Sequence, residues 1–174
     1  PLLFVPEDEA NRKERTYGIP FSQWHKDGDI IFTPGDAIDY KQILEKIMEV
    51  SQYANPQTVY IDPHNAPQLA QTLQNHGLNV EYHRQGFRSF NAPCKELERL
   101  LITRKLRHNN NACMGFQINA VEIKEDDNGL IRIIKPKHNV SGVNIDGVVS
   151  TVMSAGNMML NQAIREQNDN RYVP

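Results

Sequence analysis

The chain has 174 residues, of which 39% are hydrophobic and 23% are charged, a balance typical of one globular domain and not of a disordered segment. Its formal net charge of −2 gives no global attraction for nucleic acid, so any nucleic-acid site must be local. The sequence has no apolar run of roughly 18 residues and no basic, apolar leader, so we expect neither a membrane span nor secretion. Cys94 and Cys113 lack CxxC spacing, which predicts two packing residues in a reducing compartment.

The first half of the chain predicts strands that alternate with helices. The predicted strands cover residues 2–5, 30–33, 58–61 and 78–82. One helix begins after the N-cap Asp39 and runs to about residue 50, and a second begins at Asn65 or Ala66 and ends at Gly77. A third helix begins at Pro93 and ends in a basic cluster. The charged stretch between the first two strands, residues 7–15, is interpreted as a polar connecting segment without regular structure.

The second half predicts a β-hairpin and one long helix. Two β-rich runs, in "GFQINAVEIKEDDNGLIRIIK", join through Asn128-Gly129, a dipeptide typical of tight hairpin turns. A polar loop then leads to a helix whose apolar stripe begins at Ile145, followed by a polar tail at residues 167–174. The whole order predicts an α/β domain over residues 1–166, with a mixed sheet, helices on both faces and a β-hairpin before the last helix.

Asp62 follows directly on an apolar run and precedes a group of turn residues, in "VYIDPHNAP". One interpretation is an ordinary turn, because an Asp side chain accepts hydrogen bonds from nearby backbone N–H groups. The other is a functional site, because open α/β sheets bind ligands at the carboxyl ends of their strands. The pattern by itself leaves both interpretations open.

Asp146 lies in the first turn of an otherwise apolar helix, between Ile145 and Gly147. An acid at this place complements the helix macrodipole, which needs no further function. Gly147, however, lowers helix stability by roughly 1 kcal/mol relative to Ala. Close approach of another backbone or of a ligand would account for this glycine, so Asp146 is either a helix-start acid or a functional partner of Asp62.

Three stretches of the chain are informative when they are taken together. They are "LLFVPEDEANRKERTYGIPFSQWHKDGDIIFTPGDAIDYKQI", "VYIDPHNAPQLAQTLQNHGLNVEYHRQGFRSFNAPCKELERLL" and "NIDGVVSTVMSAG". In this order, over nearly all of residues 2–160, they resemble the C-terminal nuclease domain of tailed-phage terminase large subunits. The chain departs from that pattern at Ser150 and Ser154, which replace common alanines, and at "HNNNACMG", where an aromatic-containing strand is usual.

The resemblance implies an RNase H-like fold and metal-dependent cleavage of double-stranded DNA during genome packaging. It assigns catalysis and metal binding to Asp62 and Asp146, and it places the family's first acid in a strand before residue 2. Two Mg²⁺ or Mn²⁺ ions about 4 Å apart would activate water and neutralise the leaving oxygen. Such hard cations prefer carboxylate oxygens.

The resemblance also implies partners and a location. The expected partners are double-stranded DNA, the portal protein and the small terminase subunit, and the expected location is the host cytoplasm during virion assembly. The chain has no G-x-x-x-x-G-K-[ST] loop, so we expect the packaging ATPase in a separate upstream domain of the full protein.

Several basic side chains are candidates for supporting roles. Lys135 and Lys137, just before the last helix, would touch the scissile phosphate or a metal-bound water, or are simply solvated. The candidates for sequence-independent phosphate contacts are Arg132, Arg104, Lys105 and Arg107. The last three equally fit a basic helix end that complements the macrodipole. His138 is either a metal ligand or a loop histidine. His64 is either a site residue or a cap of the next helix, and Trp24 is expected to be a packing anchor.

Two other function classes remain open. The chain is either a nuclease or a non-catalytic module that binds DNA or docks on the portal, with an incomplete metal site. A different RNase H-like enzyme, such as a resolvase or transposase, would retain the acids but not the "TPG..IDY" pattern, which here reads TPGDAIDY.

Overall fold

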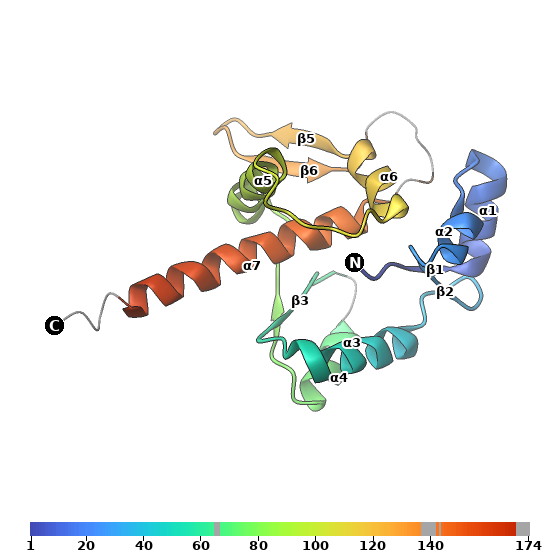
Figure 1. Cartoon of the computed structure of the whole chain (residues 1–174), viewed down its shortest axis with the longest axis horizontal. Coiled ribbons are helices and arrows are strands. Elements are labelled where there is room, and N and C mark those ends of the chain that lie inside the picture. Colours follow the sequence, from blue (N-terminus) through green and yellow to red (C-terminus); the bar gives the residue numbers. More distant parts are fainter. Residues whose placement is uncertain (65–66, 137–141, 143, 170–174) are drawn as a thin grey trace.

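The computed structural model of the chain describes residues 1–64, 67–136, 142 and 144–169 (Figure 1). The strands are β1 (Phe4–Pro6), β2 (Ile31–Thr33), β3 (Val59–Ile61), β4 (Val80–Tyr82), β5 (Glu122–Glu125) and β6 (Ile131–Ile134). The helices are α1 (Glu7–Tyr17), α2 (Phe21–Lys26), α3 (Tyr40–Ala54), α4 (Pro67–Asn75), α5 (Phe87–Ile102), α6 (Ala112–Ala120) and α7 (Asp146–Asp169). Among the described residues, no helix is both long and apolar enough to cross a bilayer.

The strands of the described residues form three two-stranded sheets instead of one continuous sheet. β1 pairs with β2 and β3 with β4, both in parallel, while β5 and β6 form an antiparallel hairpin. Helix α7 runs through the middle of the molecule, with α5 and the hairpin on one side and β3 and β4 on the other (Figure 1). The predicted α/β class and the hairpin before the last helix are confirmed.

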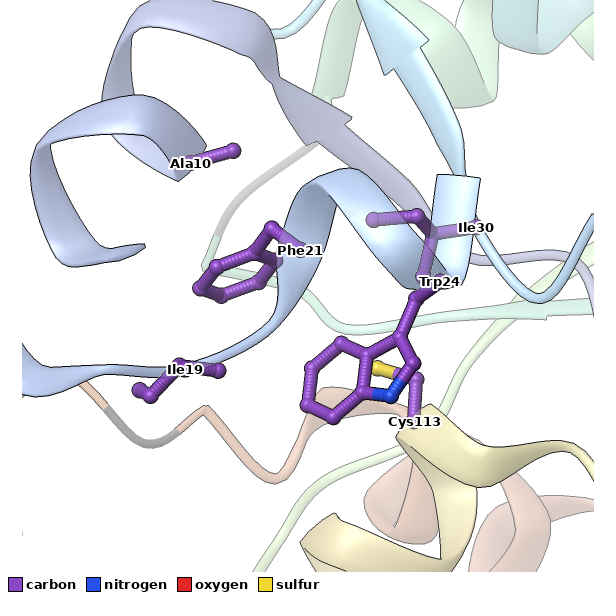
Figure 2. Close-up of a cluster of buried hydrophobic side chains, with 6 residues drawn as sticks. All are labelled: Ala10, Ile19, Phe21, Trp24, Ile30 and Cys113. Carbon is purple, nitrogen blue, oxygen red and sulfur yellow. The ribbon is translucent and has the colours of Figure 1, made fainter. Parts of the chain in front are cut away.

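Each part of the molecule has its own buried cluster. In the first, Phe21 and Trp24 of α2 meet Ala10 of α1 and Cys113 of α6 (Figure 2). The second joins α5 to α7 through Phe90, Cys94, Leu97, Val152 and Met153. The third lies between β3, β4 and α4 and consists of Ile61, Ala70, Leu73 and Val80. Trp24 is 6% exposed and packs edge-on against Phe21 at 5.4 Å between ring centroids, so its predicted role as a packing anchor is confirmed.

The segment expected to be a connection is helical instead. Helix α1 has acids in its first turn, and Lys13 pairs with Glu9 at 2.6 Å, an arrangement that stabilises an isolated polar helix. Only Ala10 of this helix is buried, so the sequence lacks the apolar stripe by which a helix is normally recognised. The short helix α2 follows because Phe21 and Trp24, three residues apart, face the same core.

Two other expectations about helices were wrong. Residues 115–120, expected in a β-rich run, belong to α6 instead. The Asn111 side chain caps the Met114 N–H at 2.8 Å, and Cys113 and Gln117 face inward one turn apart. Helix α5 begins at Phe87 and not at Pro93. Pro93 is tolerated inside it because its ring packs against α7, where a Cβ on Gly156 would lie 2.6 Å from Pro93 Cγ.

The remaining boundaries agree with the sequence to within a few residues. Asp39 caps α3, accepting the N–H of Lys41 at 2.9 Å. The hairpin turns at Gly129, which has a φ of 73°, while Asp126 Oδ1 accepts the N–H of Leu130 at 2.9 Å. Helix α7 continues to Asp169 across the predicted boundary at residue 166, and residues 170–174 of the predicted tail lie outside the described residues.

Candidate functional site

Asp62 stands at the carboxyl end of β3, half-buried, directly after the buried Ile61. Its Oδ1 accepts the backbone N–H of His64 at 3.0 Å, which is the local turn that the sequence predicts. Its Oδ2 accepts the side-chain amide of Gln85 at 2.7 Å, from the loop between β4 and α5. A carboxylate has about four lone-pair positions, so each Asp62 oxygen keeps one for a further ligand.

Asp146 is the first residue of α7 and is exposed, whereas Ile145 and Gly147 on either side are buried. Side chains approach this glycine closely: a Cβ there would contact Met114 Sδ and would lie 2.9 Å from Leu3 Cδ2, so these side-chain ends would have to move. The Gly147 N–H donates to Gln117 Oε1 at 2.8 Å. The sequence predicts that another backbone or a ligand approaches Gly147 closely. In the structure, the groups that approach it are protein side chains.

The ends of β3 and β4 lie beside the middle of α7 and not beside its first turn. The His83 N–H donates to the Ile61 carbonyl at 2.9 Å, and a Cβ on Gly156 would lie 3.7 Å from His83 Nε2. Gly156 follows Asp146 by ten residues, about 15 Å along the helix axis at roughly 1.5 Å per residue. Within the described residues, no three His, Cys, Asp or Glu side chains are arranged to hold a metal ion. Asp62 and Asp146 thus stand as two separate carboxylates in the part of the chain that the structure describes.

An open cavity of about 1360 Å³ lies beside Asp146. Its walls are mostly apolar and include Leu3, Val5, Trp24, Phe116, Val148 and Val152. Pro1 and Asp146 also border it, while Asp62 is not part of its lining. The cavity therefore opens between the first strand and the start of α7.

The basic residues that are candidates for phosphate contacts lie in different parts of the structure. Lys135 is exposed just after β6, and Arg104, Lys105 and Arg107 are exposed beyond the end of α5. Arg132 is half-buried: its Nη1 donates to the Gln85 carbonyl at 3.3 Å, and its Cζ lies 4.8 Å from the Phe87 ring centroid. Lys137 and His138 lie outside the described residues. The structure does not bring Lys135 or the α5 end into contact with Asp62, among the contacts it describes.

Gln85 is a site residue that reasoning from the sequence missed. It lies 23 residues from Asp62, and neither periodicity nor spacing connects an amide in a loop to a distant carboxylate. The only available signal was its place in "RQGFRS", inside one of the stretches that resemble the terminase pattern.

The sequence profile described as "Terminase large subunit, endonuclease domain" matches residues 2–162 of the chain. The chain belongs to this family. Curated relatives of this terminase nuclease domain include Protein YmfN of Escherichia coli (strain K12), 29% identical over 165 residues. The large terminase subunit of Enterobacteria phage HK97 is 27% identical over 160 residues. The alignments cover 92% and 90% of this chain but only 36% and 31% of those proteins, so the chain spans about a third of their length.

A solved structure confirms the fold of the domain. The crystal structure of the HK97 bacteriophage large terminase superposes with a TM-score of 0.78 and 22% sequence identity. The superposition covers 88% of this chain and 32% of that one. The predicted terminase nuclease fold is confirmed, and the RNase H-like arrangement is consistent with this match.

The donor chemistry of the two acids fits a hard divalent cation. Both offer carboxylate oxygens, the ligands that Mg²⁺ and Mn²⁺ prefer. Asp62 is already oriented by two hydrogen bonds, and Asp146 is exposed at a helix start. Two carboxylates are, however, fewer ligands than a two-ion site needs, so a complete site requires additional groups.

Proposed function

We propose that this terminase nuclease domain is a divalent-metal-dependent endonuclease that cuts double-stranded concatemeric DNA during phage genome packaging. The observation that supports the proposal best is the family match over residues 2–162, which includes both Asp62 and Asp146. Asp62 stands at the end of a parallel strand, where α/β folds place ligand-binding groups, and its oxygens keep free lone pairs.

The residues of the chain have distinct tasks in this reaction. Bound Mg²⁺ or Mn²⁺ would activate water and neutralise charge on the leaving oxygen. Asp62 would hold a cation from the end of β3, with its carboxylate oriented by Gln85 and by the His64 N–H. Asp146 would offer a carboxylate at the first turn of α7, and because it stands apart from Asp62 here, a shared two-ion site would require the two acids to come closer together. The exposed Lys135 would contact the scissile phosphate or a metal-bound water.

The other ligands of a two-ion site would come from a further segment of a longer polypeptide. The family resemblance places its first acid in a strand before residue 2, and the relatives are about three times as long as this chain. The apolar cavity bordered by Pro1 and Asp146 has the position to receive such a strand. The strand would bring its acid toward Asp146 and would pair with the open edge of β1.

The wider setting of the reaction follows from the same family. We expect the domain to act in the host cytoplasm with the portal protein, the small terminase subunit and an upstream ATPase domain. Arg104, Lys105, Arg107, Arg132 and Lys137 remain candidates for phosphate contacts, which would weaken as the salt concentration rises.

Plasmid nicking by the chain tests the proposal directly. Supercoiled plasmid would be incubated in Mn²⁺, Mg²⁺ or EDTA with a version of the chain extended upstream, beside its Asp62→Ala, Asp146→Ala and control Asp36→Ala variants. Asp36 is an acid at the surface whose side chain is 70% exposed. We expect metal-dependent nicking that falls at least a hundredfold in the first two variants and is unchanged in the control. Nicking that survives both substitutions would refute the site assignment.

A non-catalytic module that binds DNA or docks on the portal is the second candidate. It is favoured by one observation: no three-ligand metal cluster exists among the described residues. Fluorescence anisotropy with labelled duplex DNA separates the two functions. Salt-sensitive binding without nicking, in the chain and in a version extended upstream, would establish the binding module.

A further inference from the structure

Asp62 has two hydrogen-bond donors of different origin. The His64 N–H comes from the same turn, and its nitrogen lies 3.0 Å from Oδ1. This hydrogen bond is the local contact that is typical of an Asp at the start of a turn. The Gln85 Nε2 comes from the loop after the neighbouring strand and lies 2.7 Å from Oδ2. With one donor, the carboxylate rotates broadly about its terminal torsion, whereas donors on both oxygens fix its plane. The tertiary contact therefore determines how the carboxylate is oriented.

Gln85 is itself held in place from the opposite side. Its backbone carbonyl accepts Arg132 Nη1 at 3.3 Å, and the Arg132 guanidinium lies over the Phe87 ring. The adjacent Gly86 N–H donates to Ser89 Oγ at 3.1 Å, which closes the loop at the start of α5. Residues of α5 and β6 thus hold the backbone of the β4–α5 loop at Gln85 and Gly86.

The choice of an amide has an electrostatic consequence. A neutral donor orients the carboxylate and leaves its full negative charge available to a cation, whereas a bound guanidinium would compete for that charge. The guanidinium of Arg132 instead contacts the backbone carbonyl of Gln85 and the ring of Phe87. The side-chain donor that the structure describes for Asp62 is therefore the neutral Gln85 amide.

The geometry points to Gln85 as a positioning residue that orients the Asp62 carboxylate for a divalent cation and is held in place by Arg132 of the β5–β6 hairpin. The inference rests on the proposed function, because it concerns the same metal site. Outer hydrogen-bond partners of metal ligands typically change metal affinity by about 10- to 100-fold. Gln85 makes no contact with metal or DNA in this assignment and acts only through Asp62.

The experiment uses the chain extended upstream and measures Mn²⁺ binding by titration calorimetry and the Mn²⁺ dependence of plasmid nicking. The variants are Gln85→Met, which keeps the side-chain length but removes the donor, and Gln85→Glu, which adds a second negative charge. Asp62→Ala is measured in parallel. The matched control is Gln23→Met, since Gln23 Nε2 donates to Asp27 Oδ1 at 2.9 Å in an exposed pair remote from the site.

We expect Gln85→Met to bind Mn²⁺ about tenfold more weakly, because the Asp62 carboxylate is no longer oriented. Gln85→Glu also loses the donor, but its added negative charge attracts the cation, so its affinity should fall less. Their nicking should recover at high Mn²⁺, and their melting temperatures should match that of the Gln23 control. If Gln85→Met binds Mn²⁺ within twofold of wild type while Asp62→Ala does not bind, Gln85 has no positioning role and the proposed function stands. A lower melting temperature with nicking that excess Mn²⁺ does not restore would instead mark Gln85 as structural. If the wild-type chain binds no Mn²⁺, or Asp62→Ala binds it normally, both this inference and the proposed metal site are overturned.

Discussion

Two helical glycines of this domain occupy opposite environments. Gly156 of α7 faces α5, and a Cβ there would lie 2.6 Å from Pro93 Cγ, on a rigid ring that has little freedom to move. Gly115 of α6 is exposed, and a Cβ there would meet nothing within 4 Å. The same substitution should therefore have opposite effects at the two positions.

We predict that Gly156→Ala destabilises the domain by about 1–3 kcal/mol because α5 and α7 must move apart. Gly115→Ala should stabilise it by about 1 kcal/mol through helix propensity alone. Urea unfolding followed by circular dichroism measures both free energies of unfolding. Equal changes in the two variants would contradict the close packing of Pro93 on α7.

Among the elements, α3 depends most visibly on its N-terminal cap. None of its residues is fully buried, so packing holds it less firmly than it holds α5. Asp39 Oδ1 accepts the N–H groups of Lys41 at 2.9 Å and Gln42 at 3.4 Å, which satisfies donors that have no partner within the helix.

We predict that Asp39→Ala lowers the free energy of unfolding by about 1 kcal/mol. The control is Asp36→Ala, because the Asp36–Arg12 pair, 3.2 Å apart, is highly exposed and should contribute less than about 0.5 kcal/mol. Hydrogen exchange at the first turn of α3 localises the effect. Exchange that is equally fast in both variants would argue against a specific cap.

At the scale of the whole molecule, the two cysteines lie in two different buried clusters, so the reactivity of each thiol measures how often its own cluster opens. Cys113 belongs to the cluster around Trp24, and Cys94 to the one between α5 and α7. Burial raises the pKa of each thiol above its ordinary value of 9.0, because the thiolate would lose hydration inside the fold. A raised pKa in the folded state favours folding below pH 9, and this contribution is lost as the pH rises further.

We predict that neither thiol reacts with a disulfide reagent within minutes at pH 8, and that both react in urea. Comparison of Cys94→Ala with Cys113→Ala then reveals whether the clusters open together. Stability should fall as the pH is raised above about 9, more so in wild type than in the double alanine variant. Rapid labelling of either thiol without urea would contradict its burial at 7% and 4% exposure.

Local patterns in the sequence were sufficient for features that short-range chemistry decides. Asp39 caps α3, Gly129 turns the hairpin, and β3 ends just before Asp62, because each depends on side chains within a few residues. The family also followed from the sequence, since its ordered motifs extend over nearly the whole chain. The roles of Asp62 and Asp146 in catalysis remain predictions.

Only the tertiary structure decided the features that depend on distant partners. Residues 112–120 are helical because Cys113 packs near Trp24 and Gln117 receives the Gly147 N–H. Pro93 lies inside α5 because α7 packs against its ring. Gln85 meets Asp62 across 23 residues and Arg132 across 47, distances over which periodicity and propensity provide no information. The sequence by itself determined the family and the local turns and caps, and the fold determined which side chains surround the candidate acid.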